Sequence, residues 1–81
     1  MKHISYDTKG TCSRHIDVLV DDNDCIVEVS FEGGCNGNFQ GIGALIRGMK
    51  VQDVIHKLDG IRCGTKSTSC PDQLCRALES R

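Results

Sequence analysis

Six cysteines in a chain of 81 residues are the side chains most able to do chemistry. Four of them lie in contexts typical of turns: Gly10-Thr11-Cys12-Ser13, Gly33-Gly34-Cys35-Asn36-Gly37, Cys63-Gly64 and Cys70-Pro71. Cysteines in such loops can turn their sulfur atoms toward a common point, and neighbouring backbone N–H groups can hydrogen-bond a thiolate. Four thiolates suit a tetrahedral zinc ion, so these contexts indicate Cys12, Cys35, Cys63 and Cys70 as zinc ligands.

The spacing of these cysteines leaves other uses open. The four are separated by 22, 27 and 6 residues, whereas zinc ribbons and fingers usually contain paired Cys-x2–4-Cys knuckles. An iron–sulfur cluster also takes four thiolates, but its common local runs are absent. Reduced cysteines that hold no ligand remain a further alternative.

Cys70 has a second possible role because it stands where a helix is expected to begin. Pro71 suits the first helical position, and Asp72 adds a carboxylate that the helix dipole favours. Cys70 is thus expected at the N-cap, where backbone N–H groups and the dipole stabilise a thiolate. This favours a thiol redox or electron-transfer protein as the alternative function, with Cys70 as nucleophile and Cys63, or else Cys75, as resolving partner.

The overall charge and hydropathy exclude several classes of partner. The net charge is −1 and the basic residues are dispersed, so no basic stripe for nucleic acid is present. No apolar run approaches the roughly 18 residues of a membrane-spanning helix, and the first six residues contain no signal-peptide core. We therefore expect a cytoplasmic protein, where reduced thiols favour a metal site over a disulfide scaffold.

The first part of the chain has the alternation of half-buried strands. Residues 15–20 place Ile16, Val18 and Val20 on one face, and residues 25–31 place Cys25, Val27, Val29 and Phe31 on one face. The turn residues 21–24 join these segments into an antiparallel hairpin. Residues 3–8 are expected to form a third strand.

Helices are expected in the second part. Asn38 should cap the first, Gly48 should end or bend it, and Gly60 suits the position just past a second helix over 51–58. A third helix from Pro71 should turn three residues inward: Leu74, Cys75 and Leu78. The sequence predicts one α+β domain over residues 1–81, with an antiparallel N-terminal sheet followed by two to three helices on one face.

Two weaker sites can be considered beside the cysteines. The helix start at Asn38 could hold an anion weakly, although the glycine-rich segment matches neither a dinucleotide-binding fingerprint nor a P-loop. His15 lies three residues from Cys12 and could replace a thiolate, although a surface position is favoured, and His56 is expected to be exposed. No Ser/His/Asp set or pair of carboxylates stands out.

Three motifs together resemble the TSCPD-domain family, in particular its small stand-alone branch with four cysteines. They are Gly10-Thr11-Cys12-Ser13, residues 33–38 around Cys35, and the segment from Cys63-Gly64 through Thr68-Ser69-Cys70-Pro71-Asp72 to Leu74. The resemblance spans nearly the whole chain. It implies that the family's four cysteines correspond to Cys12, Cys35, Cys63 and Cys70, and it leaves Cys25 and Cys75 as core residues.

The resemblance also implies a setting for the function. A related domain occurs near the C-terminus of cobalamin-dependent ribonucleotide reductases, and stand-alone members are often labelled after that enzyme. An 81-residue chain cannot enclose a radical-shielding barrel, a cofactor site and a substrate pocket, so we expect no reductase activity from it alone. The leading expectation is a zinc-binding accessory module, with a ribonucleotide reductase as partner. A ligand-free scaffold that dimerises through its apolar helices is a further alternative.

Overall fold

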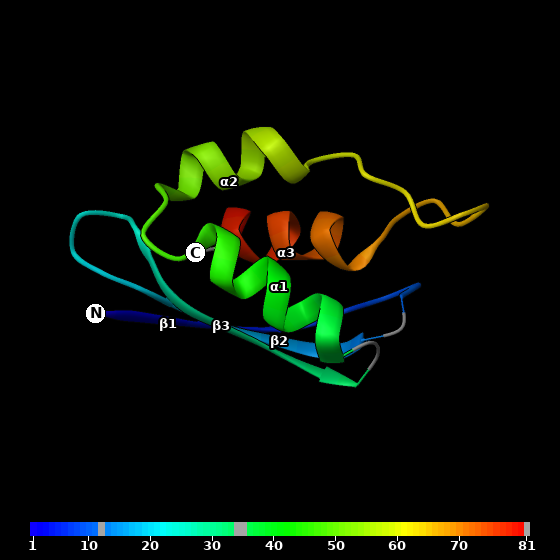
Figure 1. Cartoon of the computed structure of the whole chain (residues 1–81), viewed down its shortest axis with the longest axis horizontal. Coiled ribbons are helices and arrows are strands. Elements are labelled where there is room, and N and C mark those ends of the chain that lie inside the picture. Colours follow the sequence, from blue (N-terminus) through cyan, green and yellow to red (C-terminus); the bar gives the residue numbers. More distant parts are fainter. Residues whose placement is uncertain (12, 34–35, 81) are drawn as a thin grey trace.

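The structure is a computed structural model that describes residues 1–11, 13–33 and 36–80. Its elements follow the order β-β-β-α-α-α: β1 Lys2–Asp7, β2 Ser13–Val20, β3 Ile26–Gly33, α1 Asn36–Ile46, α2 Val51–Leu58 and α3 Cys70–Glu79. The strands form one antiparallel sheet in the order β1-β2-β3, and the helices lie on one of its faces (Figure 1). The expected α+β fold is therefore confirmed, including the third strand.

The helices form two tiers above the sheet. Helix α1 lies against β3, α3 lies against β1 and β2, and α2 packs on α3 (Figure 1). Alternation in β2 supplies the floor of the core, since Ile16 and Val18 are fully buried and Val20 nearly so. From the helices, Val51 and Val54 of α2 and Leu74, Cys75 and Leu78 of α3 are fully buried against this layer.

The hairpin between β2 and β3 differs from the expected pairing by one residue. Asp21 closes the turn because its Oδ1 accepts hydrogen bonds from the backbone N–H groups of Asn23 (2.9 Å) and Cys25 (3.0 Å). The register then shifts between Leu19 and Val20, and Val20 pairs with Ile26. Ile26, not Cys25, is the residue that enters the core, because this bulge inverts the alternation at the start of β3.

Cys25 is consequently only half-buried, so its expected place in the core is wrong. It forms an isolated bridge with Lys50, at the edge of the helical layer. Beyond the bulge the predicted face is recovered, since Val29 and Phe31 pack against the core.

Glycines mark the ends of α1 and α2. Gly48 (φ +86°) terminates the α1 segment and Gly60 (φ +79°) follows α2, both in the left-handed region that glycine adopts without steric cost, as predicted. Helix α1 begins at Asn36, three residues before the expected first helical residue Phe39, so Asn38 lies in its first turn and is not the N-cap. No helix within the described residues is both long and apolar enough to cross a membrane.

Candidate metal centre at the start of helix α3

Ser69 is the residue that caps α3. Its backbone is extended (φ −148°), and its hydroxyl accepts a hydrogen bond from the N–H of Asp72 at 3.2 Å while donating one to the carbonyl of Ile61 at 2.6 Å. The expected N-cap role of Cys70 is therefore wrong: Cys70 is the first helical residue and Pro71 the second. A serine hydroxyl is a far better acceptor for the free N–H groups than a thiol, which explains the shift by one position.

Asp72 ties the preceding loop to the helix. Its carboxylate accepts hydrogen bonds from the Thr68 hydroxyl and from the backbone N–H of Gly60, the latter at 2.8 Å. These contacts, led by the Thr68 hydrogen bond, lower the pKa of Asp72 below its usual range. The loop that contains Cys63 is thus attached to α3 at Ser69 and again at Asp72.

We expect Ser69→Ala to lower the free energy of unfolding by about 1 kcal/mol, since it removes an N-cap hydrogen bond. For a domain of this size such a loss lowers Tm by about 4–8 °C. Thermal unfolding by circular dichroism measures it. The control is Ser80→Ala at the opposite, exposed end of α3, where the hydroxyl donates only to the carbonyl of Ala77. Equal melting temperatures for Ser69→Ala and wild type would contradict the capping role.

Cys70 is buried beneath this first turn, with 9% of its surface exposed. The hydroxyl of Ser13, itself 3% exposed, donates a hydrogen bond to Cys70 Sγ across 3.3 Å. Ser13 is the first residue of β2, so the sulfur links the start of α3 to the sheet.

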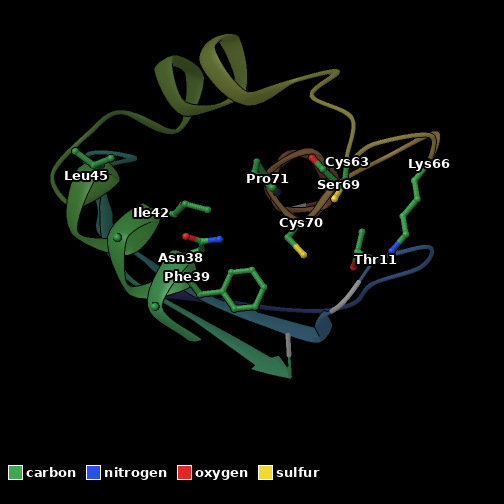
Figure 2. Close-up of a pocket in the computed structure, with 12 residues that line it drawn as sticks. Thr11, Asn38, Phe39, Ile42, Leu45, Cys63, Lys66, Ser69, Cys70 and Pro71 are labelled. Atoms are coloured by element: carbon green, nitrogen blue, oxygen red, sulfur yellow. The ribbon is translucent and has the colours of Figure 1, made fainter. Parts of the chain in front are cut away.

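Cys63 and Cys70 line the same cavity of about 460 Å³. In Figure 2 the two cysteines lie with Ser69 and Pro71 on one wall, and the α1 residues Asn38, Phe39, Ile42 and Leu45 lie on the opposite wall. Phe39 is held by a stacked contact with Phe31 of β3, with ring centroids 4.3 Å apart. The cavity therefore lies between α1, the start of α3 and the loop before it.

Cys12 and Cys35 lie outside the described residues, so the structure does not test them as ligands. Thr11 lines the cavity, and Ser13 donates to Cys70. Gly37, at the start of α1, lines it from the other side.

The family model of the TSCPD domain matches residues 1–81. The chain belongs to the TSCPD domain family. The letters of that name are residues 68–72 of this chain, which form the capped start of α3 described above. No curated protein and no solved structure matches the chain.

Cys75 and Cys25, the two cysteines of this TSCPD domain outside the predicted ligand set, have other surroundings. Cys75 is fully buried in the core, and burial raises the pKa of its thiol to about 11. Its Sγ donates to the carbonyl of Ile55 at 3.8 Å, so it stays a protonated core thiol, as predicted. Cys25 lies at the hairpin, where its Sγ is 3.8 Å from the carbonyl of Asn23.

His15 is directed away from the cysteine region. Its Nδ1 lies 2.6 Å from an Asp7 carboxylate oxygen and its Nε2 lies 2.7 Å from Ser5 Oγ, on the face of the sheet opposite the helices. The idea that His15 replaces a thiolate is therefore wrong, because both ring nitrogens have partners on the other side of β2. His56 is exposed on α2, as expected.

Sequence reasoning missed this Ser5–His15–Asp7 chain of hydrogen bonds, because it depends on the register of β1 against β2. The hydrogen bond with Asp7 is the main cause that raises the pKa of His15, with further help from Asp17. These hydrogen bonds join β1 to β2.

Proposed function

We propose that this TSCPD domain is a small non-catalytic module that binds zinc through Cys12, Cys35, Cys63 and Cys70. The observation that supports it best is the shared cavity of Cys63 and Cys70, which the sequence neighbours of the other two cysteines also border. Six residues separate Cys63 from Cys70 in the chain. The hydrogen bonds of Ser69 with Ile61 and of Asp72 with Gly60 nevertheless attach the loop that contains Cys63 to the start of α3. A tetrahedral ion with zinc–sulfur distances of about 2.3 Å needs this kind of convergence.

The donor chemistry also fits zinc. Thiolate ligands are commonly oriented by hydrogen bonds from a surrounding shell, and Ser13 gives such a bond to Cys70. Zinc bound there would crosslink the start of β2, the start of α1, the loop and α3. Its role is structural, because the binding free energy of such an ion contributes directly to folding in small domains.

Metal analysis of anaerobically purified protein tests the proposal. We expect one zinc per chain, and we expect Cys63 to resist alkylation until a chelator removes the ion, although its side chain is exposed. Cys25, which is also accessible in part, should be alkylated at the same rate with and without chelator. Protein that is folded, metal-free and unaffected by chelator would contradict the zinc function.

A thiol redox protein is the second candidate, favoured by the exposed Cys63 beside the buried Cys70 in one cavity. The two thiols would join in a disulfide, passing two electrons and two protons to an oxidised disulfide substrate. Metal-free protein with a reversible Cys63–Cys70 disulfide, detected by mass spectrometry, would establish this function in place of zinc binding.

The proposal includes an accessory role beside a ribonucleotide reductase in the cytoplasm. Its support is the membership of the TSCPD family, since a related domain occurs near the C-terminus of cobalamin-dependent ribonucleotide reductases. Titration of the metal-loaded protein into a purified ribonucleotide reductase, followed by calorimetry, tests the association. Absence of binding heat and of any change in nucleotide reduction would remove the partner and leave the zinc function standing.

A further inference from the structure

The cavity between α1 and α3 is far larger than a metal ion requires. Its volume of about 460 Å³ lies within the range of small-molecule sites, roughly 300–1,000 Å³. Apolar side chains form much of its wall: Phe39, Ile42, Leu45 and Pro71. Leu45 is 79% exposed, an unusual state for a leucine that belongs to a concave surface.

Two glycines of α1 leave the cavity open down to the helix backbone. A Cβ atom at Gly37 or Gly41 would meet nothing within 4 Å, and both residues line the cavity. Gly43 differs, because a Cβ there would lie 3.3 Å from Val29 Cγ1, so close packing on the sheet explains that glycine. Glycine inside a helix is destabilising, and the fold itself gives no steric reason for it at position 41.

Among the described residues, the wall of the cavity carries positive charge and no negative charge. Of the described residues that line the cavity, Lys66 is charged and none is acidic. No ion pair of Lys66 occurs within the described part of the chain, and Figure 2 shows its side chain extending beside Thr11. An occupant with a negative group near Lys66 and an apolar body along α1 would match both features.

We propose that this cavity binds a small organic anion with an apolar body, which lies against the bare backbone of α1 at Gly41 and places its charge near Lys66. This proposal does not rest on zinc binding, although both concern the cavity that Cys63 and Cys70 line. The metal content of every protein sample is measured alongside, so a failure of one proposal is distinguishable from a failure of the other.

The anionic aromatic probe 8-anilinonaphthalene-1-sulfonate tests the cavity in the folded full chain. We expect saturable binding by fluorescence, with chemical-shift changes of ¹⁵N-labelled protein at Gly41, Ile42 and Lys66. The uncharged analogue N-phenyl-1-naphthylamine should bind at least fivefold more weakly. No binding to the folded protein, equal affinity for both molecules, or shift changes elsewhere would each overturn the proposal.

Two variants, each with a matched control, test the named residues. Gly41→Gln should raise Tm, because glutamine favours the helix, yet weaken the anionic probe at least fivefold by filling the cavity. Ala44→Gln adds the same side chain at an exposed position of α1 outside the cavity and should leave binding unchanged. Lys66→Gln should remove the preference for the anion, whereas Lys57→Gln, beside a smaller neighbouring cavity, should not.

Other results of these variants count against the proposal. Unchanged affinity in both Gly41→Gln and Lys66→Gln would overturn it, as would a loss with Lys57→Gln in place of Lys66→Gln. Sedimentation that shows a dimer whose formation displaces the probe would also overturn it, because a second copy of the chain would then be the occupant.

Discussion

Replacement of Cys70 by serine is expected to abolish metal binding and to destabilise the whole domain. A core of about 80 residues supplies only about 3–5 kcal/mol, so a structural ion supplies a comparable part of the stability. We expect the free energy of unfolding to fall by about 3 kcal/mol or more, which lowers Tm by about 12 °C or more. Metal analysis and thermal unfolding of anaerobically prepared Cys70→Ser measure both effects.

Cys25 and Cys75, the two cysteines outside the predicted ligand set, give matched controls for this prediction. Cys25→Ser changes a half-buried thiol at the hairpin and should keep both metal and Tm. Cys75→Ser places a hydroxyl in a fully buried position, so it should lower Tm while the metal content stays at the wild-type value. Retention of zinc and an unchanged Tm in Cys70→Ser would contradict the proposed ligand set.

The other three predicted ligands extend the test, and two of them, Cys12 and Cys35, lie outside the residues that the structure describes. Cys12→Ser and Cys35→Ser should each reproduce the loss of metal seen with Cys70→Ser, and Cys63→Ser should do the same. A variant that keeps its metal identifies a cysteine outside the ligand set. This series separates a four-sulfur site from a two-thiol redox pair, in which Cys12 and Cys35 are dispensable.

Local patterns predicted the sheet well because strands carry their own periodicity. Alternation in residues 15–20 identified the buried face of β2, and the acidic turn identified the hairpin. The bulge beside Val20 could not be predicted, because it arises from how the turn at Asp21 meets the pairing with Ile26. A shift of one residue exchanges the two faces, so Cys25 was placed in the core where Ile26 belongs.

The starts of the helices were predicted less well than their ends. Glycines at positions 48 and 60 mark ends through their own backbone conformation, which needs no partner. Starts depend on which polar side chain reaches the free N–H groups. At α3, Ser69 and Cys70 were adjacent candidates, and the contact of Ser69 with Ile61 decides between them only after the loop has folded.

The residues that flank the cysteines predicted which of them belong to the site, but the sequence did not predict the cavity. Turn-like neighbours separated Cys63 and Cys70 from Cys75, and in the structure Cys63 and Cys70 line one cavity whereas Cys75 is buried in the core. Ser13 was missed as a partner of Cys70 because the two residues are 57 positions apart in the chain. Contacts of this length depend on how α3 packs across β1 and β2.

Truncation of a core side chain in α3 should show how small the free energy of unfolding of this domain is. Leu74 is fully buried between the sheet and α2, and Leu74→Ala removes apolar contacts and leaves a cavity. Such substitutions cost about 2–5 kcal/mol, which is close to the whole stability of a core this size. We therefore expect Leu74→Ala to be largely unfolded after chelator treatment, as measured by circular dichroism and urea titration.

Zinc should restore the fold of Leu74→Ala, since an ion that binds only the native state shifts the equilibrium toward it. Leu45→Ala is the matched control: it removes the same atoms from a side chain that is 79% exposed, and its urea midpoint should equal that of wild type. A chelated Leu74→Ala protein as stable as wild type would show that the stacking of α3 on the sheet contributes little. A Leu74→Ala protein that zinc cannot refold would show that the core must form before the metal site can close.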